Sequence, residues 1–182
     1  MNKQYTFILA FFIAFFFTSS HLLSQIQTQI DNANIGDVIV VAEGAYNESL
    51  VIDKSITLQA DGAVILNVAG FLTGISIQSN ISNVIIDGFT ITGDNSTGSG
   101  ITVSPGANDI TITNNTIQDI LLPGGGNDSP LSYGILCYGD TDPVNPPSNI
   151  VIDNNSINNV LGSAISLGSD TENVLISNNT FS

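Results

Sequence analysis

The residues best suited to hold a ligand are concentrated in one irregular part of the chain, between positions 122 and 148. Three carboxylates and two tyrosines flank Leu136 there: Asp128, Tyr133, Tyr138, Asp140 and Asp142. A tyrosine ring can stack on the apolar face of a sugar, and carboxylates bind Ca²⁺ or act as acid and base. We therefore expect a ligand site here. The simpler alternative is a pair of solvated turns, since the stretch is rich in Gly and Pro.

The same residues do not form a recognisable catalytic or metal site. Asp140-x-Asp142 lacks the further oxygen ligands at fixed offsets that a Ca²⁺ loop needs. We therefore expect no metal and no cofactor, with Ca²⁺ as the weaker alternative. The chain has no Arg, and its one histidine, His21, lies near the N-terminus, so a nucleophilic triad would lack its base. Lys54 is interpreted as a turn lysine, and no catalytic residue is predicted.

The composition excludes several classes of partner. The chain has 182 residues, with 2 basic and 16 acidic side chains and a net charge of −14. A nucleic-acid-binding face needs Lys and Arg to neutralise phosphates, so no nucleic-acid partner is expected. A hydrophobic content of 42% argues against intrinsic disorder. The single cysteine, Cys137, excludes a disulfide framework and is typical of a small buried hydrophobe.

Residues 1–24 predict a secretory signal peptide. Lys3 supplies a positive charge, and an apolar run extends from Phe7 to Phe17. This run is shorter than the roughly 20 residues of a membrane-spanning helix. Small residues follow, so we expect cleavage after Ser20 or after Ser24; a retained membrane anchor is the alternative. The prediction is a secreted, extracellular or cell-surface protein, with the periplasm as a further location and no membrane insertion of the mature chain.

Two families of short segments repeat along residues 25–182. The first family starts with Asn or Asp, at Asn83, Asp109, Asn149 and Asn173, which are 26, 40 and 24 residues apart. The second starts with a small residue, at Gly74, Gly100, Gly134 and Ala164. Apolar residues alternate with others in each copy, which is the period of a β-strand. Since no helix-length segment lies between copies, we predict stacked parallel strands with the long interval explained by two inserted loops.

Two adjacent positions at the end of each first-family copy predict a corner. The first position holds the residues that most readily accept positive φ: Gly88, Asn114, Asn154 and Asn178. The second holds Asn115, Asn155 and Asn179. Stacked about 4.8 Å apart, these three amides can hydrogen-bond along the coil axis. Such a ladder would satisfy buried amides that otherwise cost about 1–3 kcal/mol each.

The repeated pattern Asn-apolar-x-Ile-x-Asn-Asn-Thr-Ile resembles the right-handed parallel β-helix repeat of the pectate-lyase-like superfamily. The stretch from Ile35 to Gly62 is similar to the N-terminal coils of secreted members such as pectin methylesterases and NosD-like proteins. The resemblance implies an all-β, right-handed, single-stranded parallel β-helix of about 5–6 rungs over residues 25–182. It also implies an Arg in the catalytic sets of the lyases and esterases, which this chain does not have.

The two ends of the predicted coil differ. Residues 25–33 place Ile26, Ile30 and Ala33 on one face of a short helix, which we expect to cap the N-terminal end. The sequence ends at Ser182 inside a copy of the repeat. We therefore expect no C-terminal cap and further β-helix rungs of the same protein, with a partner on that end as the alternative.

Three functions agree with these observations. The first is a secreted or cell-surface module that binds a polysaccharide or cell-surface glycan without catalysis. Leu136 belongs to its site because hydroxyl residues occupy the aligned outward positions, Ser76, Thr102 and Ser166. The second is the N-terminal part of a polysaccharide lyase or hydrolase whose catalytic base lies beyond Ser182. The third is a structural stalk or adhesin. The catalytic sets of the lyases and esterases need an Arg, and the chain has none. We therefore predict the first function, a non-catalytic glycan-binding module.

Overall fold

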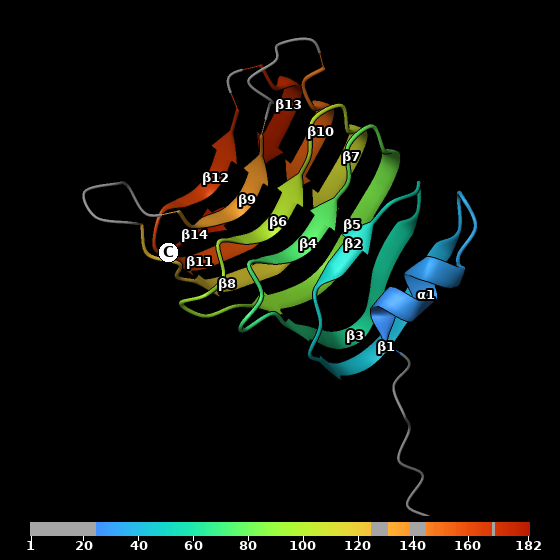
Figure 1. The fold of residues 1–182 in the computed structure, drawn as a ribbon, viewed down its shortest axis with the longest axis horizontal. Helices are drawn as coiled ribbons and strands as arrows, with labels where there is room; N and C mark the ends of the chain where they lie inside the picture. The colour runs from blue at the N-terminus through green and yellow to red at the C-terminus, as the bar shows by residue number, and fades with distance from the viewer. Residues whose placement is uncertain (1–24, 125–130, 139–144, 169) are drawn as a thin grey trace, which may run out of the picture.

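A computed structural model describes residues 25–124, 131–138, 145–168 and 170–182 (Figure 1). The predicted signal peptide, Asp128, Asp140 and Asp142 lie outside the described residues. The elements are α1 (Ile26–Asn32), β1 (Val38–Tyr46), β2 (Leu50–Ile52), β3 (Thr57–Asn67), β4 (Thr73–Ile77), β5 (Ser82–Thr92), β6 (Ser99–Val103), β7 (Asn108–Thr113), β8 (Thr116–Ile120), β9 (Tyr133–Cys137), β10 (Ser148–Asp153), β11 (Ser156–Val160), β12 (Ser163–Leu167), β13 (Glu172–Ser177) and β14 (Thr180–Phe181).

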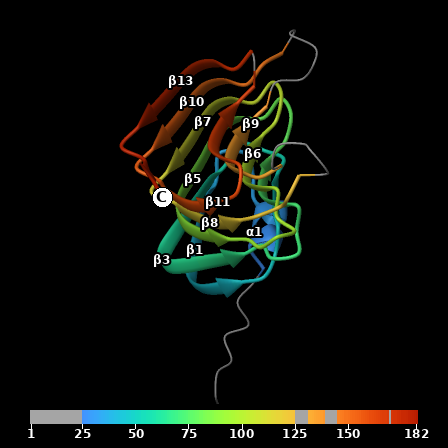
Figure 2. The same ribbon diagram turned by 90° about the vertical axis from the view of Figure 1, so that its left-hand side faces the viewer.

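These strands form two sheets in which every described pair is parallel. One sheet has five strands in the order β12-β9-β6-β4-β2. The other has nine, in the order β13-β10-β7-β5-β8-β11-β14, with β3 paired to β5 and β1 paired to β3. Strand β5 pairs with β7 through its first half and with β8 through its second. The nine-stranded sheet therefore bends around a corner, and Figures 1 and 2 show successive coils stacked along one axis.

The core lies between the sheets and consists of columns of similar apolar residues. Register aligns them across neighbouring coils, as in Val84, Ile110 and Ile150 from one sheet and Ile75, Ile101 and Ile135 from the other. Each of these side chains is completely buried, and such burial contributes about 1.5–3 kcal/mol per side chain. The alternating pattern of the repeats thus places its apolar positions inside the coil, which confirms the predicted all-β parallel β-helix.

The second repeat family begins with glycine because neighbouring coils approach too closely for a side chain. A Cβ added to Gly100 would lie 2.5 Å from Ile117 Cγ2 and 2.7 Å from the Gly134 carbonyl oxygen. One added to Gly134 would lie 2.5 Å from the Ala164 carbonyl oxygen. Carbon atoms in contact normally stay about 3.5–4.0 Å apart. The glycine column is therefore a packing requirement of the coil.

The corners contain left-handed residues joined by hydrogen bonds. Residues Gly88, Asn114, Asn154 and Asn178 have φ of 84°, 57°, 54° and 54°. Beside them, the Asn115 amide donates from Nδ2 to Asn155 Oδ1 over 3.1 Å, and Asn155 Nδ2 donates to Asn179 Oδ1 over 3.0 Å. The Asn115 and Asn155 backbone N–H groups donate to the same two acceptors. Each amide thus bridges two coils.

A second left-handed column, which the sequence analysis did not identify, begins the strands of the nine-stranded sheet. It consists of Asn83, Asp109, Asn149 and Asn173, with φ between 52° and 57°. Asn173 Nδ2 donates to Asn149 Oδ1 over 3.2 Å, and Asn149 Nδ2 donates to Asn108 Oδ1 over 2.8 Å. The Asn or Asp that opens every copy of the first repeat family was the signal for this column, because these residues tolerate positive φ.

Helix α1 covers the N-terminal end of the core, as predicted, with Ile26 and Ile30 completely buried. Two charged side chains hold it. The Glu48 carboxylate accepts the Ile26 N–H over 2.7 Å, and Lys54 Nζ donates to the Ile30 carbonyl over 3.1 Å. The negative Glu48 carboxylate thus lies at the partially positive N-terminal end of α1, and the positive Lys54 ammonium group lies at the partially negative C-terminal end. Among the described residues, no helix has the length and apolar character needed to span a bilayer.

The last coil differs from those beneath it in the exposure of its inward-facing residues. Ile176 and Phe181 align in register with the buried Ile152 and Ile157. They are nevertheless 43% and 51% exposed. Strands β12, β13 and β14 form the corresponding edges of the two sheets (Figure 1). The apolar columns therefore continue up to an open edge of the coil.

Candidate functional site

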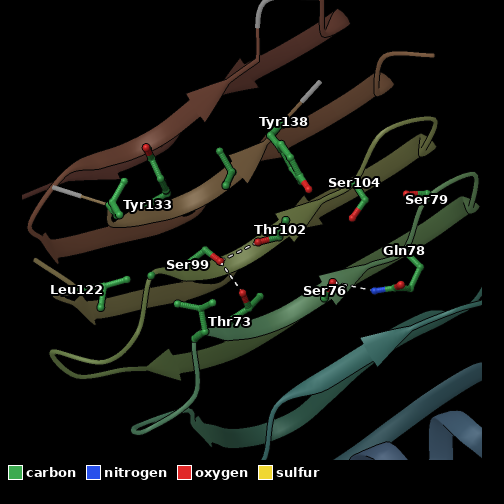
Figure 3. A pocket seen from close by; sticks show the side chains of 14 residues that line it. Thr73, Ser76, Gln78, Ser79, Ser99, Thr102, Ser104, Leu122, Tyr133 and Tyr138 are labelled. Carbon is green, nitrogen blue, oxygen red and sulfur yellow. Dashed lines mark hydrogen bonds between the residues drawn. The ribbon is translucent and has the colours of Figure 1, made fainter. Parts of the chain in front are cut away.

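A groove of about 580 Å³ crosses the outer face of the five-stranded sheet (Figure 3). We call it the hydroxyl groove, because most of its floor consists of Ser and Thr side chains. Its lining residues are Leu72, Thr73, Ser76, Gln78, Ser79, Gly98, Ser99, Thr102, Ser104, Leu122, Leu131, Tyr133, Leu136 and Tyr138. The groove brings together the three described members of the predicted ligand site: Tyr133, Leu136 and Tyr138.

Parallel register arranges the floor of the groove in rows that cross β4, β6 and β9. Thr73, Ser99 and Tyr133 form one row, and Ser76, Thr102 and Leu136 form another. Neighbouring members of a row are about 4.8 Å apart, the spacing of strands in a sheet. The β9 member is the bulky one in each row. Strand β9 therefore provides a raised apolar and aromatic side next to a lower hydroxyl surface.

The glycine column explains how Tyr133 reaches this outer face. Strict alternation would place Tyr133 on the same side as Ile135, which is completely buried in the core. However, Gly134 and Ile135 are both buried, so the alternation shifts by one residue at the start of β9. Tyr133 consequently lines the groove together with Leu136 and Tyr138. Gly134, where the neighbouring coil approaches closely, thus lies at the point where the alternation of β9 shifts.

The hydroxyl groups of the floor are connected by hydrogen bonds. Ser99 Oγ donates to Thr73 Oγ1 over 3.1 Å and lies 2.7 Å from Thr102 Oγ1. Ser99 and Thr102 are both buried. Nearby, Gln78 Nε2 donates to Ser76 Oγ over 3.0 Å (Figure 3). The floor thus presents a fixed array of donors and acceptors, since a hydroxyl can act as either.

Apolar residues close one end of the hydroxyl groove. Leu72 and Leu131 are 65% and 51% exposed, and Leu122 lines the groove beside them. The segment is held in place because the Leu122 N–H donates to the Thr97 carbonyl over 3.1 Å. In addition, the buried Ser132 hydroxyl donates to the Leu122 carbonyl over 2.6 Å. A ligand in the groove would therefore meet apolar surface at this end and tyrosine rings along β9.

The described lining of the groove contains no Asp, Glu, Lys, Arg or His side chain. Among all described residues, no group of three His, Cys, Asp or Glu is placed to hold a metal ion. Asp128, Asp140 and Asp142, which the sequence analysis assigned to the same site, lie outside the described residues. The arrangement that the structure shows is thus suited to binding through hydrogen bonds and ring contacts.

Cys137 lies directly behind the groove and faces the core. Its side chain is completely buried, and this burial raises the pKa of the thiol from 9.0 to about 12. A thiol in this state is neutral at ordinary pH and is a poor nucleophile and a poor metal ligand. Cys137, the last residue of β9, therefore acts as a small core residue.

A second hollow, of about 400 Å³, lies on the nine-stranded sheet. Its lining includes Gly36, Asn83, Ile85, Asp109 and Thr111, and none of its described lining residues is aromatic. Ile85 belongs to an outward column that aligns it with Thr111, Val151 and Leu175. The described lining of this second hollow has neither the tyrosine rings nor the hydrogen-bonded hydroxyls of the hydroxyl groove. The hydroxyl groove is therefore the stronger candidate site.

Comparison with known proteins agrees with this architecture. Residues 19–182 match the family described as a right-handed β-helix region. A cell surface glycoprotein of Methanothermus fervidus is 37% identical over 109 residues, which are 58% of this chain and 17% of that protein. This chain thus spans a small part of that relative's length.

A solved structure is similar in fold. The alginate lyase from Paenibacillus sp. str. FPU-7 superposes with a TM-score of 0.65 and 21% sequence identity, covering 85% of this chain and 62% of that one. At this level of identity the likeness concerns the fold alone. The family match and the stacked parallel strands show that this chain belongs to the right-handed β-helix family, as its repeats predicted.

Proposed function

We propose that this protein is an extracellular or cell-surface β-helix module whose hydroxyl groove binds a polysaccharide. The observation that carries the proposal is the pairing of two tyrosine rings, Tyr133 and Tyr138, with a floor of connected hydroxyls. Sugars offer the same two chemistries, apolar C–H faces for the rings and hydroxyls for the floor. The names of the related proteins, a cell surface glycoprotein and an alginate lyase, are in keeping with this proposal.

The size of the groove suits a segment of a glycan chain. Tyr133 and Tyr138 are five positions apart in the sequence, so their backbones are about 16 Å apart along the strand direction. A volume of about 580 Å³ lies within the range of about 300–1,000 Å³ that small-ligand sites occupy. Tyr138 is 47% exposed, which leaves much of its ring available for contact. An oligosaccharide lying along β9 could meet both rings.

The chemistry of the groove favours binding over turnover. Glycoside hydrolysis uses a pair of carboxyl groups held at a defined distance, and the described lining has none. A tyrosine can transfer a proton, but no charged side chain of the described lining stands beside Tyr133 or Tyr138 to assist it. We therefore propose a non-catalytic binding module. In the same proposal, residues 1–24 are the secretory signal peptide and residues 25–182 the β-helix domain.

A glycan array tests this function. The purified chain is compared with the double variant Tyr133→Ala/Tyr138→Ala and with Thr111→Ala, a control on the outer face of the other sheet. We expect the wild type and the control to retain the same glycans, and the double variant to lose them. Circular dichroism verifies that the double variant is folded. Equal retention by all three proteins, or no retained glycan at all, contradicts the proposal.

An enzyme assay separates this function from a lyase. A lyase acting on a uronate polymer releases an unsaturated product that absorbs ultraviolet light. We expect no increase in absorbance when the purified chain is incubated with alginate or polygalacturonate. A sustained increase that disappears in the Tyr133→Ala/Tyr138→Ala variant would show that the groove is catalytic.

A further inference from the structure

The described lining of the hydroxyl groove carries no charged side chain, although the protein as a whole is strongly acidic. Its described lining consists of Ser, Thr, Gln, Gly, Leu and Tyr residues, whereas the whole chain has a net charge of −14. Summed charge of one sign attracts or repels charged ligands before contact is made. A polymer that carries a carboxylate on each sugar would approach this protein against repulsion and would meet no cation in the described groove.

The single basic side chain of the described residues is not available to such a polymer. Lys54 Nζ donates to the carbonyl oxygens of Ile30, Asp31 and Ala33 over 3.1, 3.2 and 3.4 Å, and it lies 3.6 Å from Asp53 Oδ1. It is therefore committed to the C-terminal end of α1. Carboxylates are usually recognised by Arg or Lys through charge-assisted hydrogen bonds, and the described part of the chain has no other such group.

Neutral sugars fit the same groove without these difficulties. The Ser99, Thr102 and Thr73 hydroxyls and the Gln78 amide can donate to or accept from sugar hydroxyls. Desolvating a carboxylate against this surface without an ion-pairing partner is strongly unfavourable. The described lining therefore offers complementary contacts to uncharged sugar rings, and none of its side chains carries a positive charge that would compensate for a carboxylate.

We infer that the hydroxyl groove selects an uncharged polysaccharide and discriminates against polyuronates. This inference rests on the proposed function and specifies its ligand class. It separates the chain from its structural neighbour, whose name gives alginate, a polyuronate, as its substrate. The discrimination originates in the side chains of β4, β6 and β9 and in the net charge, and the shared coil architecture is compatible with either ligand class.

Matched polymers that differ only in charge test the inference. Isothermal titration calorimetry of the purified chain uses alginate and polygalacturonate, the carboxyl-reduced form of each, and glucan, galactan and mannan oligosaccharides with their C6-oxidised forms. We expect each bound neutral form to bind about tenfold or more tighter than its charged counterpart, because the carboxylates lose water against this surface without gaining an ion-pairing partner. Added salt should narrow the difference, since it screens the repulsion.

Two variants test whether the groove itself sets this preference. Gln78 is an exposed lining residue, so Gln78→Lys and Gln78→Glu change the local charge without altering the core. We expect Gln78→Lys to improve binding of the charged polymers and Gln78→Glu to weaken it further. Equal responses of the two variants would show that the discrimination does not arise in the groove.

The outcomes distinguish the inference from the function beneath it. Tighter binding of alginate or polygalacturonate than of their reduced forms overturns the inference and leaves polysaccharide binding intact. Polyuronate binding that appears only when Ca²⁺ is added also overturns it, because a bridging cation would then replace the missing base. Failure to bind any polymer of either charge rejects the proposed function together with the inference.

Discussion

The hydroxyls of Ser99 and Thr102 lie 2.7 Å apart on the floor of the hydroxyl groove, where both side chains are buried. Ser99 also donates to Thr73 Oγ1 on the neighbouring strand. The three hydroxyls form a connected chain across two strands, which fixes their directions before a ligand arrives. A preorganised polar surface of this kind loses little entropy on binding, so its individual hydroxyls should contribute measurably to affinity.

Replacing one of these hydroxyls should weaken glycan binding without unfolding the protein. Thr102→Val keeps the shape of the side chain and leaves Ser99 bonded to Thr73. We expect affinity for the retained glycan to fall about three- to tenfold, the value of one hydrogen bond of about 1 kcal/mol. Thr111→Val on the other sheet is the matched control. Unchanged affinity of Thr102→Val in calorimetry would show that the floor does not contact the ligand.

The internal asparagine ladder should stabilise the coil. Asn155 accepts from the Asn115 backbone and side chain and donates to the Ile112 carbonyl over 2.9 Å. Asn155→Ala leaves several buried groups unpaired, so the free energy of unfolding should fall by about 2–4 kcal/mol. Asn158→Ala, at a partly exposed position of β11, the strand that follows Asn155, should change the free energy of unfolding by less than about 0.5 kcal/mol. Similar losses for both variants in urea unfolding would contradict the ladder's role.

The glycine column should not tolerate a methyl group between coils. In Gly134→Ala the new Cβ would meet the Ala164 carbonyl oxygen and Ile157 Cγ2 at 2.5 and 2.6 Å. Overpacking of this kind destabilises by about 1–3 kcal/mol, and it should also displace Tyr133 and weaken glycan binding. Ala164→Gly, at the aligned position of edge strand β12, should cost about 0.5–1 kcal/mol. A Gly134→Ala protein with wild-type stability and affinity would refute this account.

Cys137 should make the protein less stable in alkali. Burial raises its pKa from 9.0 to about 12 in the folded state, so between these values the unfolded chain loses a proton that the folded chain keeps. The unfolded state then binds fewer protons, and the free energy of unfolding falls as pH rises through this window, by at most about 1.4 kcal/mol per unit.

A comparison of wild type with Cys137→Ala checks this pH dependence. The difference between their slopes of unfolding free energy against pH isolates the contribution of the thiol, because every other group is common to the two proteins. We expect the wild type to have the steeper decline above pH 9.0. Native Cys137 should also react slowly with iodoacetamide and rapidly once urea unfolds the chain. Parallel slopes, or rapid labelling of the native protein, would be inconsistent with a buried neutral thiol.

The fold could be predicted from the repeats because the strands, their stacking and the corners each correspond to a different feature of the sequence. Alternating apolar residues marked strands, the 24–26 residue period implied stacking, and Asn at fixed positions indicated corners. These signals can be read within one repeat or from the spacing between repeats. The stacking of similar residues in columns follows from the same two features. The hydrogen bonds that Glu48 and Lys54 form with the two ends of α1 were not predictable. Each joins residues more than twenty positions apart in the sequence, and no repeated pattern marks them.

The site was predictable only in part. Leu136 was noticeable because it interrupts a hydroxyl column of the repeat, and Tyr133 and Tyr138 were noticeable because they are aromatic residues in the one irregular part of the chain. The rest of the floor was not, since Thr73 and Ser99 resemble ordinary solvated positions until register places them beside Tyr133. The outward position of Tyr133 also depends on the burial of both Gly134 and Ile135, which an alternating pattern does not anticipate.

The central claim is that Tyr133 of β9 and Tyr138, which directly follows β9, contact a glycan. Nuclear magnetic resonance can test this claim directly. Ring resonances of Tyr133, Tyr138 and the buried Tyr46, assigned with single Tyr→Phe variants, are followed while a neutral oligosaccharide retained on the array is added. We predict saturable shifts of Tyr133 and Tyr138 with the same dissociation constant as calorimetry, and no shift of Tyr46. Saturable binding that leaves both groove tyrosines unperturbed would contradict the account.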